Sequence, residues 1–220
     1  MPTSRTYGDG CGIARALDVV GERWALLVVR ELLLGPQRFS DLRHALPNAS
    51  SNLIADRLHE LEDRDVVARR RLPPPAGSAV YELTEWGQQL EPIVLALGEW
   101  GTRAPFPSGP ITLSASSAVI ALRSFARPDR SKPPLTIDLQ LDDRAWTARA
   151  SAGRLRVRSG APGRSDVVVR SDPVSFADTF GNPGALTTAV AEGRIVATGD
   201  VPALRRLLRT VRIPSPVGVR

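Results

Sequence analysis

The stretch Arg23–Gly87, RWALLVVRELLLGPQRFSDLRHALPNASSNLIADRLHELEDRDVVARRRLPPPAGSAVYELTEWG, decides how the first half of this chain folds. Three of its segments carry apolar residues at helical spacing: Trp24–Leu34, Ser40–Leu46 and Ser51–Asp63. Two strand-like runs follow, Val66–Leu72 and Ala79–Leu83, joined by Pro73–Ser78. Prolines and a glycine are typical of a hairpin tip. We therefore expect a helical core followed by a β-hairpin.

The two central helices have the spacing of a helix-turn-helix. Gly35 and Pro36 end the preceding helix, and the cluster Asn48–Ser51 suits the cap of a new one. In that new helix Ile54, Leu58 and Leu61 fall at i, i+4 and i+7 and predict one buried stripe. A second helix of this kind can enter the major groove of DNA while its partner supports it. With the hairpin as a wing, the pattern predicts a winged helix-turn-helix.

The candidate DNA-contacting residues lie on this pair of helices and on the first hairpin strand. They are Arg38, Ser40, Ser50, Ser51, Asn52, Asp56, Arg57, His59, Arg69, Arg70 and Arg71. We expect Asn52 to pair with adenine edges, His59 to reach a base or a phosphate, and Arg57 to contact a phosphate from the flank. Two alternatives stay open: an amphipathic helix in any bundle, and an arginine run that is simply solvated.

Composition limits the classes of protein that fit. The 220 residues are 42% hydrophobic and 24% charged, as in an ordinary globular chain. The N-terminus lacks the apolar region of a signal peptide, and the longest apolar run, Trp24–Val29, is far too short to span a membrane. We expect a cytoplasmic protein without membrane partners.

Chemistry-bearing clusters are sparse. Cys11 is the one cysteine, so a cysteine zinc site and an internal disulfide are excluded. With two histidines and no metal-like spacing, no nucleophile–base set and no cofactor loop, we expect no metal, no cofactor and no enzymatic activity. The net charge of +6 is uneven: residues 1–104 hold 12 basic and 14 acidic residues, and residues 105–220 hold 17 and 9.

Residues 105–110 form the expected linker between two domains. They are rich in proline, which cannot continue a helix and favours an extended spacer. We expect residues 1–104 to form the winged helix-turn-helix and dimerisation domain. Its last helix, Gln88–Gly101, has an apolar stripe wide enough to pack against another subunit.

Residues 111–220 should form an α+β domain. Its helix-like runs are Ser114–Phe125, Val174–Phe180, Ala185–Glu192 and Ala203–Thr210. Its expected strands are Leu135–Leu141, Arg144–Ala150, Leu155–Arg158, Asp166–Arg170 and Arg194–Thr198.

Residues 11–101 resemble the HxlR family of bacterial winged helix-turn-helix transcriptional regulators. The resemblance rests on Cys11, Ile13-Ala14, Asp18, Gly21, Arg23-Trp24, Leu32-Leu33, Gly35-Pro36, Arg38-Phe39-Ser40-Asp41-Leu42, Leu58, Leu61, Tyr81, Leu83-Thr84, Gly87 and Trp100-Gly101. It implies a homodimer formed by the terminal helices, with two reader helices spaced for a pseudo-palindromic operator.

Cys11 has two open roles. It matches the N-terminal cysteine that some members of this family use to sense electrophiles or oxidants, and Arg15 lies one helical turn away. Reactivity requires a stabilised, accessible thiolate. The alternative is a small buried residue in the dimer interface, since free cysteines are usually buried.

The second half resembles a small sterol-carrier-protein domain. The resemblance rests on the hairpin ending in Trp146, on Gly153–Val157, on Ser171–Pro173 and on Ala191–Asp200. It implies helices packed over a curved sheet, and an apolar tunnel for a hydrophobic ligand. The candidate lining residues, each of which fits an ordinary core as well, are Val119, Leu122, Phe125, Phe176, Phe180, Leu186, Val190 and Leu207.

Taken together, the sequence predicts a dimeric DNA-binding transcriptional regulator, a repressor whose operator binding responds to a hydrophobic ligand or to modification of Cys11. The alternative is a hydrophobic-ligand carrier or sensor in which the winged helix serves for dimerisation or protein contact. The net charge of −2 in residues 1–104 favours the alternative, and the arginine-bearing hairpin opposes it.

Overall fold

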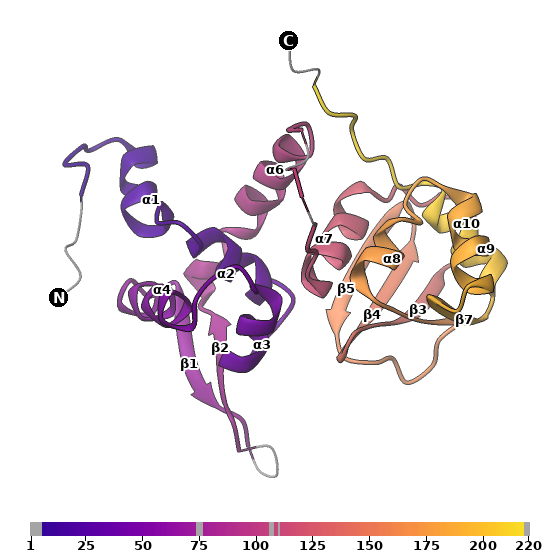
Figure 1. The fold of residues 1–220 in the computed structure, drawn as a ribbon, viewed down its shortest axis with the longest axis horizontal. Helices are drawn as coiled ribbons and strands as arrows, with labels where there is room; N and C mark the ends of the chain where they lie inside the picture. Colours follow the sequence, from indigo (N-terminus) through magenta and orange to yellow (C-terminus); the bar gives the residue numbers. More distant parts are fainter. Residues whose placement is uncertain (1–5, 74–76, 106–107, 110, 218–220) are drawn as a thin grey trace. The chain divides into compact units, whose positions relative to one another are not determined.

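The computed structural model describes residues 6–73, 77–105, 108–109 and 111–217. The chain falls into two compact units, residues 1–94 and residues 95–220, each with buried residues of its own (Figure 1). The middle of the expected hairpin tip, residues 74–76, lies outside the described residues. So do residues 106, 107 and 110 of the expected linker.

The N-terminal unit has the predicted order of helices and hairpin. Its elements are α1 (Gly12–Val20), α2 (Ala25–Leu32), α3 (Phe39–Ala45), α4 (Ser51–Asp63), β1 (Val67–Arg71), β2 (Ala79–Leu83) and α5 (Glu85–Gln88), and α6 (Glu91–Gly101) begins in it. This is a winged helix-turn-helix, with α3 and α4 as the helix pair and β1–β2 as the wing (Figure 1).

The buried stripe predicted for α4 holds the N-terminal unit together. Ile54, Leu58 and Leu61 are each at most 1% exposed and pack in one cluster with residues of α2, such as Val28 and Val29. Burying each such side chain stabilises the fold by roughly 1.5–3 kcal/mol. The stripe therefore fixes which face of α4 is left for solvent.

The wing is attached to the helices by backbone hydrogen bonds. β1 and β2 pair antiparallel from Val67–Leu83 to Arg71–Ala79. Gln37, between α2 and α3, forms an isolated antiparallel bridge with Tyr81 of β2. The Gln37 amide donates to the Tyr81 carbonyl (2.9 Å), and the Tyr81 amide donates to the Gln37 carbonyl (2.8 Å). The Gln37 side chain also donates to the Glu31 carbonyl. The segment before α3 thus acts as a short third strand.

Thr84 and Gly87 fix the other end of the wing. The Thr84 hydroxyl donates to the Asp65 carbonyl (2.6 Å) and accepts from the Gly87 amide (3.0 Å), which caps α5. A Cβ atom on Gly87 would collide with the Val66 carbonyl. Glycine is therefore needed here because α5 passes directly against the start of the wing.

The expectation of a continuous helix over Gln88–Gly101 is wrong. α5 ends at Gln88 and α6 begins at Glu91. Pro92 gives the physical reason, because its ring clashes with the carbonyl four residues earlier and it has no amide to donate. A proline in the first turn of a helix avoids both problems, so a new helix starts beside it.

Residues 111–217 contain an α+β fold, as predicted. Its helices are α7 (Ala115–Phe125), α8 (Pro173–Ala177), α9 (Pro183–Ala191) and α10 (Val201–Leu208), and its strands are β3 (Leu135–Leu141), β4 (Arg144–Ser151), β5 (Arg154–Ser159), β6 (Val167–Ser171) and β7 (Ile195–Gly199). The strands form one sheet in the order β5-β4-β3-β6-β7. β3 and β6 are parallel, and the other pairs are antiparallel.

The two faces of this sheet differ. Burial alternates along β3, where Leu135, Ile137, Leu139 and Leu141 are buried and the residues between them are half-buried. Trp146 on β4 is fully buried on the same face. Helices α7–α10 pack over that face (Figure 1). The opposite face carries mostly polar and charged residues, and α7–α10 do not cover it.

Candidate nucleic-acid interface

The exposed side of α4 begins with small neutral groups. Ser50 caps the helix, and its hydroxyl accepts from the Leu53 amide (3.3 Å). Ser51, Asn52 and Ala55 follow on the solvent side of the first turns and are exposed. The Ser50 hydroxyl therefore serves the helix cap, and the Ser51 hydroxyl and the Asn52 amide remain as exposed hydrogen-bonding groups of this turn.

Acidic residues accumulate toward the other end of α4. Asp56, Glu62 and Asp63 are exposed, and His59 lies 3.5 Å from the Asp63 carboxylate. The N-terminal end of a helix carries a partial positive charge. A helix that approaches DNA with its first turns therefore brings Asn52 forward and keeps Glu62 and Asp63 away from the phosphates. Asp56 lies between these two regions.

Arg57 does not have the position expected of a phosphate contact. Its side chain is 11% exposed and contacts Glu60 through both terminal nitrogens, at 2.7 and 2.8 Å. Glu22, before α2, lies 3.4 Å away. The physical reason is the helical period, which places residue 57 three residues after Ile54 and beside the buried stripe. Arg57 therefore links α4 to the segment before α2.

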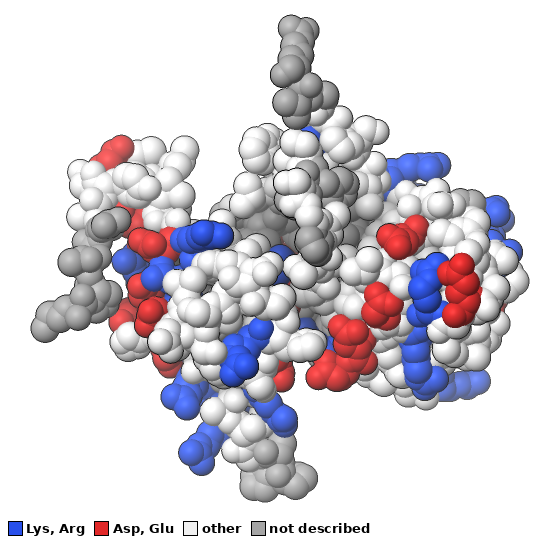
Figure 2. All heavy atoms as spheres, viewed as in Figure 1, with Lys and Arg blue, Asp and Glu red and all other residues white. Residues whose placement is uncertain are grey.

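The three wing arginines are all exposed but have different surroundings. Arg70 pairs with Glu82 of the neighbouring strand, with Nε 2.6 Å from the carboxylate. The Arg69 guanidinium lies over the Tyr81 ring, 5.9 Å from its centre. Arg71 forms no ion pair or side-chain hydrogen bond with a described residue. Figure 2 shows basic side chains gathered around the wing. Arg71, and Arg69 beside it, are therefore the arginines best placed to meet a phosphate.

Arg38 and Ser40 lie at the start of α3, next to the wing. Arg38 is exposed, and its Nε donates to the Ser78 hydroxyl before β2 (3.1 Å). Its amide donates to the Asp41 carboxylate (3.0 Å), and the Ser40 hydroxyl donates to the same carboxylate (3.1 Å). The helix pair and the wing thus share a hydrogen-bonded corner. Sequence reasoning missed Gln37, Ser78 and Tyr81 in this corner, because their roles depend on pairing between distant segments.

Cys11 is exposed at the start of α1, where it precedes the first helical residue. The nearby backbone amides of Ile13 and Ala14 hold the pKa of the thiol below its usual value. The sulfur has this lowered pKa because exposed helix-terminal amides stabilise a thiolate. Within one chain the residue is therefore accessible rather than buried.

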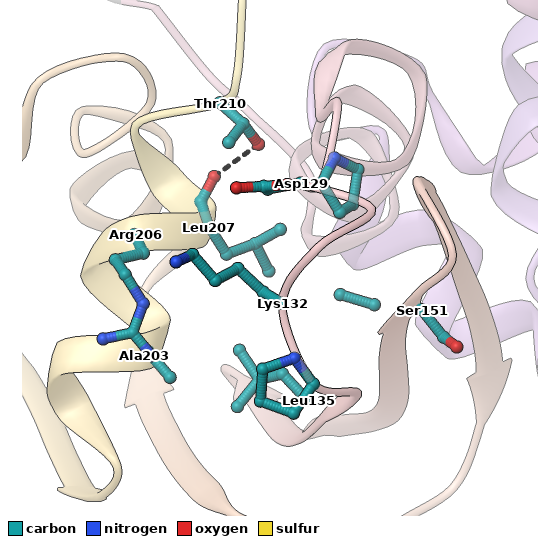
Figure 3. A pocket seen from close by; sticks show the side chains of 11 residues that line it. Asp129, Lys132, Leu135, Ser151, Ala203, Arg206, Leu207 and Thr210 are labelled. Carbon is teal, nitrogen blue, oxygen red and sulfur yellow. Dashed lines mark hydrogen bonds between the residues drawn. The ribbon is translucent and has the colours of Figure 1, made fainter.

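The apolar residues expected to line a tunnel mostly fill the core of the C-terminal unit. Six of the eight are buried, Phe180 is half-buried and Val190 is exposed. Leu207 lines a small pocket beside α10, together with residues such as Lys132 and Arg206 (Figure 3). That cavity measures about 60 Å³. Ligand sites usually measure ~300–1,000 Å³, so this pocket is too small for a lipid.

Among the described residues, no three His, Cys, Asp or Glu side chains lie close enough together to bind a metal ion.

No helix in the described ranges combines the length and the apolar character needed to cross a bilayer.

Known proteins match the part of the chain that carries this interface. Residues 19–106 match the family described as HxlR-like helix-turn-helix. YvaP, an uncharacterized HTH-type transcriptional regulator of Bacillus subtilis (strain 168), is 40% identical over 94 residues, which cover 43% of this chain and 87% of YvaP. This chain belongs to the HxlR-like helix-turn-helix family.

Two other regulators are similar over a comparable share of this chain. The HTH-type transcriptional regulator YodB of Bacillus subtilis (strain 168) is 34% identical over 85 residues, which cover 39% of this chain and 76% of YodB. A solved structure of the redox regulator HypR in its oxidized form is 32% identical, with a TM-score of 0.41, and covers 44% of this chain and 100% of HypR.

Because Arg57 is buried, we expect its substitution to reduce the stability of the fold and to leave the number of protein–phosphate contacts unchanged. Arg57→Gln should lower the free energy of unfolding by about 1–3 kcal/mol, because Glu60 keeps its charge in a half-buried site without a cation. Urea unfolding followed by tryptophan fluorescence measures this change. The slope of log affinity for DNA against log salt should stay at the wild-type value. A slope smaller by about one, with unchanged stability, would return Arg57 to the phosphate-contacting set.

Proposed function

We propose that this HxlR-type transcriptional regulator is a cytoplasmic homodimer that represses transcription by occupying a pseudo-palindromic operator. The observation that carries the proposal is the exposed first turn of α4, which presents Asn52 one turn before Asp56 and away from Glu62 and Asp63, and which lies in the same unit as a basic wing. In this mechanism α4 reads base edges in the major groove, and Arg69 and Arg71 contact the backbone beside it.

Exposed apolar residues support the homodimer. On α6, Ile93, Leu97 and Trp100 recur at i, i+4 and i+7, and Trp100 is 74% exposed. On α1, Ile13 and Leu17 are exposed as well. Apolar groups gathered in this way mark an association surface. Two copies related by a two-fold axis would present two α4 helices to half-sites about 34 Å apart, one turn of DNA.

A groove of about 440 Å³ in the N-terminal unit adds to this support. Residues of α1, such as Val19, form one side of it, and Trp86 and Ile93 form the other. An apolar helix from a second copy fits a groove of this composition. Because Gly12, which follows Cys11, also lines the groove, a change at the cysteine lies next to the proposed dimer contact.

Substitutions in α4 and in the wing should weaken DNA binding in different ways. With a duplex selected by the protein from a random library, Asn52→Ala should weaken binding by ~5- to 150-fold and leave binding to a scrambled duplex unchanged. Arg71→Gln should weaken binding to both duplexes equally and reduce the salt slope by about one. Fluorescence anisotropy titrations at several salt concentrations measure both quantities.

The matched control for Arg71→Gln is Arg103→Gln, which removes the same charge from an exposed position after α6. It should keep the wild-type affinity and slope. Selection that enriches no sequence, or equal loss in the Asn52 and Arg103 variants, would refute the proposed reading surface.

The dimer should depend on the exposed face of α6. Leu97→Glu combined with Trp100→Glu should shift the protein from dimer to monomer in sedimentation velocity, because carboxylates cannot be buried without partners. Operator affinity should fall by ~100-fold or more, since the second half-site then binds independently. Glu99→Gln, an exposed change on the same helix, should leave both unchanged. A wild-type monomer, or a double variant that stays dimeric, contradicts this assignment.

Modification of Cys11 is the proposed event that makes the protein release its operator DNA. The lowered pKa of the thiol means that the reactive thiolate forms at a lower pH than in an ordinary cysteine. Alkylation by iodoacetamide should therefore reach its half-maximal rate at a lower pH than for free cysteine, and the alkylated protein should release the operator. Cys11→Ser should keep binding after the same treatment. Alkylated protein that binds the operator as before would remove Cys11 from the mechanism.

The proposal does not extend to the hydrophobic-ligand carrier. Its support was the net charge of −2 in residues 1–104 and the expected tunnel in the C-terminal unit, and most of the residues assigned to that tunnel pack in the core. A sterol-carrier ancestry for this unit is supported by its helices packed on one face of a five-stranded sheet.

A further inference from the structure

Four arginines share the open face of the C-terminal sheet. Arg154, Arg156 and Arg158 occupy alternate positions of β5, and Arg149 lies on the neighbouring strand β4. All four are exposed, whereas Leu155 on β5 and Ala148 and Ala150 on β4 are buried on the other face. Alternate residues of a strand lie ~7 Å apart and adjacent strands ~5 Å apart. We call this set of four the arginine face.

The arginine face has little internal compensation for its charge. Arg149 and Arg156 are directly opposed across the two strands. Like charges in such a position destabilise a sheet. None of the four forms an ion pair or a side-chain hydrogen bond with a described residue. The strand positions of this face carry one carboxylate, Asp138 on β3, which is half-buried and accepts from Gln140. An external polyanion would offset this repulsion.

The side chains around the arginines indicate which polyanion fits. The open-face positions of β3, β4 and β5 carry no aromatic ring, and Trp146 points to the covered face. Single-stranded nucleic acids are held by stacking bases on aromatic side chains, and a lipid surface is held by inserted apolar groups. Neither feature accompanies these arginines. Guanidinium groups alone match the phosphate backbone of a duplex.

The distribution of charge along the chain also favours binding of duplex DNA by the C-terminal unit. Residues 1–104 have a net charge of −2, and residues 105–220 have a net charge of +8. Binding to DNA gains most of its non-specific strength from neutralised phosphates. The unit with the reader helix therefore supplies little of that strength, and the other unit has charge to supply it.

We infer that the arginine face is a second DNA-contacting surface, which binds the phosphate backbone of duplex next to the operator without reading its sequence. The inference rests on the proposed function, since the reader helix must first bring the chain to DNA. A surface in the same chain then acts at high effective concentration, so even weak phosphate contacts strengthen binding. It predicts a footprint longer than the two half-sites.

The test uses the full-length protein with the arginine face neutralised. The variant Arg149→Gln, Arg154→Gln, Arg156→Gln, Arg158→Gln is titrated against the selected duplex, extended by random flanking sequence, and against a scrambled duplex of equal length. If all four arginines contact phosphates, the salt slope falls by about 3.6 per subunit, and we expect a fall of at least two. Affinity should drop by ~10-fold or more on both duplexes, and their ratio should stay within twofold.

A control variant removes the same charge elsewhere in the unit. Arg164, Arg206, Arg209 and Arg212 are exposed and lie outside the sheet, and their change to Gln should alter the slope by less than one. Thermal unfolding checks that both variants fold. Should the quadruple variant unfold, Arg154→Gln with Arg158→Gln gives half the expected effect. Trimming the flanking DNA should reduce wild-type affinity toward that of the quadruple variant.

The outcomes separate this inference from the proposed function. If the wild type and the Asn52 and Arg71 variants behave as proposed but the quadruple variant keeps the wild-type slope, the inference alone is wrong. If the wild type shows no salt-dependent DNA binding, both are wrong. A quadruple variant that keeps its DNA slope but loses binding to vesicles containing phosphatidylserine would assign the surface to lipid and overturn the DNA assignment.

Discussion

The backbone bridge between Gln37 and Tyr81 is the contact on which the DNA-facing surface depends. An isolated two-stranded hairpin is only marginally stable in water. Here a third short strand, supplied by the residue before α3, adds two backbone hydrogen bonds to β2. The bridge fixes the wing to the same segment that starts the helix pair. Arg38 and Ser78 then join across the corner, so α3, α4 and the wing behave as one rigid reader.

Local patterns in the sequence were enough to place most elements. The bounds of α4, β2 and β3 agree with their expected ranges, because a helical stripe or an alternating run is a local property. Pro92 also acts locally, and its effect on the helix after the wing follows from its missing amide. The strand order β5-β4-β3-β6-β7 could not be derived in this way, since β4 and β5 lie between β3 and β6 in sequence and the parallel pair β3–β6 joins distant segments.

The interface shows the same division between local and distant effects. Asn52 faces solvent because it lies opposite the buried stripe of α4, and the three wing arginines are exposed on both faces of β1. Arg57 was expected to contact a phosphate from the flank of α4, although positions 54, 57, 58 and 61 follow the i, i+3, i+4, i+7 pattern of a single buried face. Its side chain is buried. The partners that make its burial tolerable, Glu22 and Glu60, could be recognised only once α4 was packed against the start of α2.

The position of β5 at the margin of its sheet also bears on how copies of this chain can associate. A marginal strand leaves one row of backbone amides and carbonyls unpaired, which invites another strand to add to it. Two β5 strands that met in this way would bring arginine against arginine along their whole length. Charge repulsion therefore disfavours growth of the sheet from chain to chain. The proposed homodimer instead uses the exposed apolar residues of α1 and α6, where a closed pair can form without leading to a fibre.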